Sequence, residues 1–135
     1  MRISAISVLI VEDEAITAMF MEAKLRNSGF NVLKRISSGE EAVDCALQLK
    51  PDLVLMDIRL AGRIDGIEAV TKIRLESVKD IQFIFTTGYS DIELKEQAVK
   101  LNPLGFFVKP VNVPELVSII LSFFSGQNKS AKVNG

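Results

Sequence analysis

The chain has no histidine and a single cysteine, and both absences exclude whole classes of chemistry. Without histidine it cannot form a Ser-His-Asp or Cys-His catalytic group, a histidine metal site or a histidine pH switch. Cys45 alone cannot form an intrachain disulfide, a redox pair or a structural zinc site. We interpret Cys45 as a small hydrophobic residue on a helix, on the face that carries Ala42, Ala46 and Leu49, and expect a reducing, cytoplasmic location.

The chain also lacks an excess of charge of one sign and any long apolar run. Sixteen basic and 17 acidic residues among 135 give a formal net charge of −1, so a basic surface for direct nucleic-acid binding is not expected. No apolar run approaches the roughly 20 residues that span a bilayer. The apolar stretch 5–11 leads directly into acidic residues, which favours a buried strand over a signal peptide. We expect one soluble domain without membrane contact.

What the chain does contain is a series of short apolar runs that alternate with segments of helical period. This alternation is typical of a parallel sheet with helices on both faces. Five strands are predicted at residues 7–11, 31–36, 53–56, 81–85 and 105–108. The second carries Lys34 and Arg35, which suits a sheet edge. We expect residues 5–125 to form the domain and residues 126–135 a flexible polar tail.

Start and stop signals place a helix after each strand. The first helix is marked by Ala15, Ile16, Met19, Phe20 and Ala23 and closes at Ser28-Gly29. Predicted capping boxes open the second helix at Ser38 and Glu41 and the fourth at Ser90 and Glu93. The third is marked by Ile67, Val70 and Ile73, and the fifth is capped by Asn112 with Pro114 in its first turn.

Polar residues follow four of the five predicted strands. Glu12 and Asp13 come after the first, Asp57 after the third, Thr87 after the fourth and Lys109 after the fifth. These strand ends share one edge of a parallel sheet, where ligands bind. Two carboxylates about 4 Å apart repel by roughly 4 kcal/mol at an effective dielectric near 20, and a hard cation relieves that repulsion. Oxygen ligands without histidine or cysteine suit Mg²⁺, with Mn²⁺ as the alternative.

The same residues suit a phosphate. Asp57 is the best candidate nucleophile, because an aspartate beside a bound metal can attack a phosphoryl donor and form an aspartyl phosphate. The Lys109 ammonium and the Thr87 hydroxyl can then stabilise the phosphoryl oxygens. Each residue also has an ordinary structural interpretation as a helix-end charge, a loop acid or a strand-end hydroxyl, so it is their combination that indicates a site.

Four separated segments resemble one known family. The acidic pair after VLIV, the aspartate ending LVLMD, the FTTGYS segment and the FFVKP segment have the order and spacing of the receiver domain of two-component response regulators, of the stand-alone chemotaxis type, over residues 5–125. The resemblance implies an α/β fold: a flavodoxin-like, doubly wound, five-stranded parallel sheet of order 2-1-3-4-5 with five helices. It implies that a sensor histidine kinase or phosphotransfer protein passes a phosphoryl group to Asp57, which fits the missing histidine.

The resemblance also implies a role for each site residue. Mg²⁺ is expected to be held by Asp13, Asp57, the main-chain carbonyl of Arg59 and, through water, Glu12. Arg59 and Tyr89 occupy the positions that tune hydrolysis in the family, and their size predicts slow self-dephosphorylation.

Three further positions concern switching and loop shape. Thr87 matches the family's switch hydroxyl, with Thr86 expected as the last strand residue. Phe106 matches the aromatic that swings inward, although it lacks the hydroxyl of the tyrosine often found there, which leaves a constant core role open. Ala61 stands where the family commonly has proline, and one extra residue follows, so the loop after Asp57 is expected to have a different shape.

Phosphorylation is expected to reshape the face made by the fourth helix, fifth strand and fifth helix, for a downstream protein target or a homodimer. One alternative is a pseudo-receiver that binds a partner without phosphorylation. Another is a Mg²⁺-dependent phosphohydrolase, which Arg59 disfavours because it stands where an assisting acid is needed. No effector domain is expected after residue 125, so the domain acts alone or has been taken from a larger hybrid protein.

Overall fold

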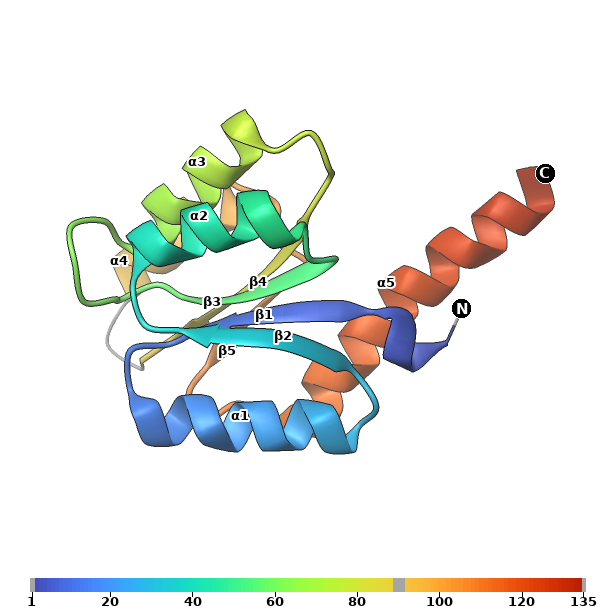
Figure 1. Cartoon of the computed structure of the whole chain (residues 1–135), viewed down its shortest axis with the longest axis horizontal. Helices are drawn as coiled ribbons and strands as arrows, with labels where there is room; N and C mark the ends of the chain where they lie inside the picture. Colours follow the sequence, from blue (N-terminus) through green and yellow to red (C-terminus); the bar gives the residue numbers. More distant parts are fainter. Residues whose placement is uncertain (1, 89–91, 135) are drawn as a thin grey trace.

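The computed structural model describes residues 2–88 and 92–134 and places a parallel sheet between two layers of helices (Figure 1). The strands are β1 Ser7–Val11, β2 Asn31–Ile36, β3 Leu53–Asp57, β4 Gln82–Thr87 and β5 Gly105–Val108. They form one five-stranded sheet of order β2-β1-β3-β4-β5 in which every neighbouring pair is parallel. The predicted flavodoxin-like α/β fold is therefore confirmed, with β2 at an edge as expected.

The helices are α1 Ala15–Asn27, α2 Gly39–Leu49, α3 Gly66–Glu76, α4 Ile92–Val99 and α5 Val113–Asn134, after a short 3₁₀ turn at Ile3–Ala5. Figure 1 shows α2 and α3 on one side of the sheet and α1 and α5 on the other. Side chains alternate along β3, so Val54 and Met56 pack with α2, α3 and α4, whereas Leu53 and Leu55 pack with α1 and α5. Burial on both faces explains why the central strands are uniformly apolar.

Ser38 and Asn112 cap their helices as predicted, although Glu41 accepts from the Ser38 hydroxyl and not from its backbone N–H as a capping box requires. The Ser38 hydroxyl accepts a hydrogen bond from the Glu41 N–H at 3.3 Å, and the Asn112 side chain accepts one from the Glu115 N–H at 3.0 Å. The sequence analysis missed the capping box of α3, in which Asp65 and Glu68 each accept from the other's backbone N–H. The predicted cap at Ser90 lies outside the described residues.

The buried face of α1 differs from the one that the apolar residues suggested. Ile16, Met19 and Phe20 are 80%, 56% and 53% exposed, whereas Ala18, Met21 and Leu25 make the contact with the sheet. Helix α1 holds more apolar residues than one face accommodates, so their period alone selects the wrong face. Leu49 at the end of α2 is likewise exposed, and Cys45 is only half-buried against the core.

Helix α5 takes in residues 126–134, where the sequence analysis placed a polar tail. No proline follows Pro114, and the segment contains glutamine, lysine and alanine, which favour a helix, although Gly126 does not. Figure 1 shows the end of α5 extending away from the sheet. The flexibility of this segment stays a prediction.

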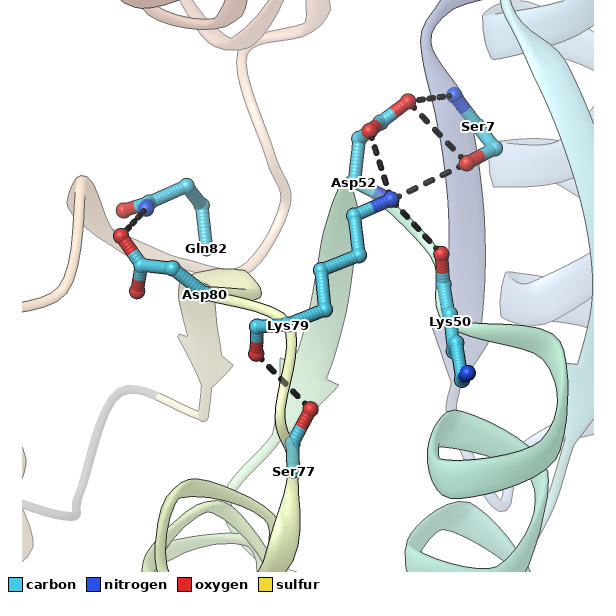
Figure 2. A network of polar contacts seen from close by, with 7 residues as sticks. All are labelled: Ser7, Lys50, Asp52, Ser77, Lys79, Asp80 and Gln82. Atoms are coloured by element: carbon cyan, nitrogen blue, oxygen red, sulfur yellow. Dashed lines mark hydrogen bonds and ion pairs between the residues drawn. The ribbon is translucent and has the colours of Figure 1, made fainter.

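The amino ends of β1, β3 and β4 are joined by a polar network (Figure 2). Asp52 Oδ2 accepts from the Ser7 N–H at 2.8 Å, and Asp52 Oδ1 pairs with Lys79 Nζ at 2.9 Å. Lys79 Nζ also donates to the Lys50 carbonyl at 2.8 Å. Partial burial raises the pKa of Asp52, but the contacts with Ser7 and Lys79 outweigh it and hold the pKa below its usual range. This network stabilises the end of the sheet opposite to the polar strand ends.

Among the described residues no helix is long and apolar enough to cross a membrane.

Candidate functional site

Three carboxylates meet at the carboxyl edge of the sheet, as the sequence analysis predicted. Glu12 and Asp13 follow β1, and Asp57 is the last residue of β3, the neighbouring strand. One oxygen from each of the three lies within 4.8 Å of the others. Glu12 and Asp57 are buried and Asp13 is exposed. Parallel pairing of β1 with β3 brings these residues together across more than forty positions of sequence.

Lys109 reaches the same cluster from the end of β5. Its Nζ lies 2.9 Å from Asp57 Oδ2 and 2.5 Å from Glu12 Oε1, so one ammonium bridges the two buried carboxylates. The Lys109 backbone N–H donates to the Thr87 carbonyl at 2.8 Å, which fixes the end of β5 against β4. The peptide bond between Lys109 and Pro110 is cis. The predicted convergence of Lys109 with the acidic residues is present in the structure.

Backbone donors orient the two buried carboxylates. The Glu14 N–H donates to Glu12 Oε2 at 3.1 Å, and the Arg59 N–H donates to Asp57 Oδ1 at 3.3 Å. Both donors lie two residues after the carboxylate that they contact, where the chain turns away from its strand. The sequence analysis did not identify these donors, because a turn of this kind leaves no side-chain signature.

The electrostatics are those of two buried carboxylates that share one ammonium. Burial, and next the Glu12 carboxylate, raise the pKa of Asp57 to about 7, although Lys109 lowers it. Burial raises the pKa of Glu12 too, but hydrogen bonding with Asp57 and Lys109 holds it below its usual range. The site therefore disfavours the charged form of Asp57 and favours the charged form of Glu12.

The outer carboxylate and the ammonium shift as well. Burial and the neighbouring Glu12 raise the pKa of Asp13. Burial lowers the pKa of Lys109, but its contacts with Glu12 and Asp57 outweigh this and raise the pKa overall. The negative charge that remains at this edge favours a cation.

The donor set fits Mg²⁺. Carboxylate oxygens are the hard ligands that this ion prefers, and Mg²⁺ commonly takes one or two carboxylates and keeps several waters. The exposed Asp13 gives the cluster access to solvent, which such waters require. Asp13 and Asp57 can thus contribute direct oxygen ligands, with Glu12 close behind them.

The two threonines at the end of β4 face opposite sides of the sheet. Thr87 belongs to β4, so the expectation that Thr86 is the last strand residue is wrong. Thr86 pairs with Asp57 in the β3–β4 register, and Thr87 pairs with Val108 in the β4–β5 register. Both threonines are buried. Alternation places Thr87 on the face of Phe85, which packs with α2, α3 and α4.

Phe106 packs against this same face but is only half-buried. Because β5 is an edge strand, its side chains have a neighbouring strand on one side only. Lys95 on α4 places its ammonium 5.4 Å from the centre of the Phe106 ring. Of the two residues predicted to tune hydrolysis, Arg59 is exposed beside Asp57, and Tyr89 lies outside the described residues.

An apolar hollow beside the acidic cluster went unrecognised in the sequence. It has a volume of about 480 Å³ and is lined mainly by α1 and by residues 109–111. The exposed Ile16 and Phe20 form its α1 side, and Lys109 joins it to the acidic cluster. The available signal was the surplus of apolar residues on α1, which the sequence analysis used only to mark the helix.

The fold and the geometry can now be compared with known proteins. The sequence pattern of the response regulator receiver domain matches residues 8–121. This chain belongs to that family. Receiver domains are the modules of two-component signalling and phosphorelays, so the predicted family is confirmed.

Individual relatives agree with this assignment. The transcriptional regulatory protein PdtaR of Mycobacterium tuberculosis is 35% identical over 113 residues, which are 84% of this chain and 54% of PdtaR. This receiver thus spans about half the length of the curated relatives that it matches first, apart from one phosphodiesterase of which it spans 28%.

Solved structures are similar over most of both chains. The signal receiver domain of a modulated diguanylate cyclase from Desulfovibrio desulfuricans G20 has a TM-score of 0.81 and 35% identity, with 92% of this chain and 97% of that chain covered. The receiver domain of the sensor histidine kinase PA1611 from Pseudomonas aeruginosa has a TM-score of 0.76 and 29% identity, with 86% and 94% covered. That crystal structure holds a magnesium ion coordinated in its active site cleft.

Proposed function

We propose that this receiver is a switch that accepts a phosphoryl group on Asp57 from the phosphohistidine of a sensor histidine kinase or phosphotransfer protein. The observation that carries the proposal is the buried Asp57 carboxylate, held by Lys109 beside Glu12 and Asp13. Burial of the Glu12 and Asp57 carboxylates is costly. One ammonium serves both of them and Asp13 lies beside them, so a positively charged ligand at this site lowers the cost.

The reaction is an in-line phosphoryl transfer. An Asp57 carboxylate oxygen attacks phosphorus, the new oxygen–phosphorus bond forms, the phosphorus–nitrogen bond breaks, and its electron pair stays on the donor's imidazole nitrogen. Lys109 lies 2.9 Å from Asp57 and can follow the negative charge as it moves onto the phosphoryl oxygens. Only the ionised carboxylate is nucleophilic, so the contact with Lys109, which lowers the pKa of Asp57, favours the reaction.

The metal ion is assigned to this chain's own oxygen atoms. Asp13, Asp57 and the Arg59 main-chain carbonyl are its proposed ligands, with Glu12 acting through water and Mn²⁺ as a substitute for Mg²⁺. Mg²⁺ supplies positive charge that offsets the charge of the phosphoryl group and its acceptor. The magnesium ion in the PA1611 receiver supports this assignment by similarity.

The output is proposed to arise on the face made by α4, β5 and α5. Thr87 is the proposed switch hydroxyl, and Phe106, on the same side of the sheet, is the aromatic side chain that can follow it inward. Val99 and Val108 are 49% and 43% exposed on or beside this face, which gives a downstream protein or a second copy an apolar contact. Arg59 and Tyr89 are proposed to slow the loss of the phosphoryl group, which is the only turnover that we assign to the domain.

We assign the apolar hollow beside Lys109 to the phosphodonor protein. Its position next to the acidic cluster allows a helix of the donor to pack on Ile16 and Phe20 while its phosphohistidine reaches Asp57. A small donor needs no such surface. Phe20→Ala is therefore expected to slow phosphorylation by a histidine kinase at least tenfold and leave phosphorylation by acetyl phosphate unchanged. Leu75→Ala, an equally apolar change at an 81% exposed position on α3, serves as the control.

Intact mass spectrometry tests the central proposal. The chain is incubated with Mg²⁺ and acetyl phosphate, beside an Asp57→Ala variant and a sample with EDTA. One added phosphoryl group is expected in the first sample only. If no adduct forms even when a histidine kinase is present, the switch is excluded. The chain would then be a partner-binding module that works without phosphorylation.

A further inference from the structure

The segment between Asp57 and α3, residues 58–65, is held at its near end by the sheet, and we call it the β3–α3 loop. The Ile58 N–H donates to the Thr86 carbonyl at 3.0 Å, and the Gly66 N–H donates to the Ile58 carbonyl at 2.7 Å. A Cβ atom on Gly66 would lie 2.2 Å from the Asp57 carbonyl oxygen, so only glycine lets the chain return this close to Asp57. The loop therefore leaves and rejoins the structure beside Asp57.

The far end of the loop is held by Glu40, a half-buried residue in the first turn of α2. Its Oε1 accepts hydrogen bonds from the Arg63 N–H and, at 3.0 Å, from the Ile64 N–H. Its own backbone N–H and those of Arg63 and Ile64 hold the pKa of Glu40 below its usual range. One carboxylate of α2 therefore fastens two consecutive residues of the loop.

Two further contacts bring the loop against the start of α2. Gly62 has a φ of +103°, which favours glycine at this turn, and a Cβ atom there would lie 2.5 Å from Glu40 Oε2, so a larger residue would displace the Glu40 carboxylate. Ser38 and Ala61 form a parallel bridge. The β3–α3 loop therefore docks on the start of α2.

Arg59 lies between these two anchored ends. Its N–H contacts Asp57 Oδ1 at 3.3 Å, and Ala61, two residues later, is already paired with Ser38. A loop that is free at its far end must be ordered when a ligand binds, and that ordering weakens binding. A loop that is anchored beforehand avoids this loss.

We infer that Glu40 is a positioning residue for the acidic site: by fastening the β3–α3 loop to α2, it orders the Arg59 backbone beside Asp57 and raises the affinity for Mg²⁺. This inference rests on the proposed function, which assigns the Arg59 carbonyl as a Mg²⁺ ligand. Glu40 itself touches neither the metal ligands nor the phosphoryl group. Its effect passes through the backbone of residues 61–64.

A Mg²⁺ titration of the ¹⁵N-labelled full chain, followed by NMR, tests the inference in the absence of any phosphodonor. Glu40→Ala is expected to raise the Mg²⁺ dissociation constant about three- to tenfold. This is less than the roughly 10- to 100-fold loss typical when a direct partner of a metal ligand is removed, because Glu40 acts through the loop backbone. Glu40→Gln keeps an oxygen that can accept both N–H groups, so its dissociation constant is expected within twofold of wild type. Gly62→Ala, which disrupts the same contact from the loop side, is expected to resemble Glu40→Ala.

Asp44→Ala is the matched control, because Asp44 lies one turn further along α2, is exposed and carries the same charge. It is expected to leave the dissociation constant unchanged. Amide hydrogen exchange provides a readout that does not involve the metal. In Glu40→Ala the Arg63 and Ile64 amides are expected to exchange faster in metal-free buffer, while amides of the central strands keep their protection.

Three results would overturn the inference. An unchanged Mg²⁺ affinity in Glu40→Ala would show that the loop needs no anchor. Equal losses in Glu40→Gln or Asp44→Ala would assign the effect to net charge instead of hydrogen bonding. Phosphorylation of Asp57 is measured separately with acetyl phosphate, so its failure in wild type removes the proposed switch but not the role of Glu40 in metal binding. A wild-type chain that binds no Mg²⁺ would overturn both the metal assignment and the role of Glu40.

Discussion

At the scale of single residues, the burial of Asp57 costs stability. Its pKa of about 7 in the folded chain exceeds the ordinary aspartate value, so the folded state favours the protonated form. Stability from this group is therefore present at low pH and is lost as the pH rises through 7. Asp57→Asn removes the buried charge that causes this loss of stability. The variant is therefore expected to stabilise the metal-free chain by about 2 kcal/mol at pH 8. This is less than the roughly 4 kcal/mol that a shift of three pKa units represents.

Thermal unfolding with EDTA from pH 4 to pH 8 measures this effect. The difference in Tm between Asp57→Asn and wild type is expected to grow between about pH 4 and pH 7 and then to level off. Asp80→Asn, an exposed change at the other end of the sheet, is expected to show no such trend. A gain that is the same at every pH would contradict the raised pKa.

Lys109 contacts two of the carboxylates at the proposed Mg²⁺ site, so we expect it to oppose metal binding. Its Nζ contacts Glu12 at 2.5 Å and Asp57 at 2.9 Å, so removal of the ammonium leaves a more negative site. Lys109→Met is therefore expected to bind Mg²⁺ severalfold more tightly in calorimetric titration but to be less stable without it, by about 2 kcal/mol. The same variant is expected to accept phosphoryl groups more slowly. Weaker Mg²⁺ binding in Lys109→Met would show that the ammonium helps rather than hinders the cation.

At the scale of elements, the start of α3 depends on one cap. The Asp65 carboxylate accepts from the Glu68 N–H at 2.9 Å, and Glu68 returns the contact. Asp65→Ala removes this capping box and is expected to cost about 1 kcal/mol, which lowers Tm by roughly 3–5 °C for a domain of this size. Differential scanning calorimetry measures the loss. Asp65→Asn is expected to recover most of it, since asparagine caps nearly as well as aspartate.

At the scale of the whole molecule, metal binding and folding are linked. The acidic cluster draws its residues from two strands that are adjacent only in the folded state, so Mg²⁺ is expected to bind the native chain alone. A Mg²⁺ concentration of about 100 times the dissociation constant then adds about 2.7 kcal/mol of stability. Tm is expected to rise by roughly 10 °C over EDTA at that concentration. Asp13→Ala, which removes an exposed ligand, is expected to abolish most of the rise, and an equal rise in that variant would contradict the ligand assignment.

The local sequence was sufficient to predict those features that depend on one residue or on a short hydrophobic period, such as strands, helix caps and strand-end residues. Five apolar runs predicted the strands, Asn112 predicted the start of α5, and polar residues at strand ends predicted the cluster of Glu12, Asp13, Asp57 and Lys109. Parallel strands bring their carboxyl ends to one edge whatever the details of packing, so this part of the site follows from strand order alone.

Only the tertiary structure decided which helix face is buried, which distant residues meet and how burial changes a pKa. The apolar residues of α1 fit two faces, and only contact with the sheet selects Ala18, Met21 and Leu25 and leaves Ile16 and Phe20 exposed. The contacts of Glu40 with the β3–α3 loop span more than twenty residues, and no local pattern encodes them. The same holds for the pKa of Asp57, since sequence places a carboxylate at the strand end but only burial beside Glu12 raises its pKa to about 7.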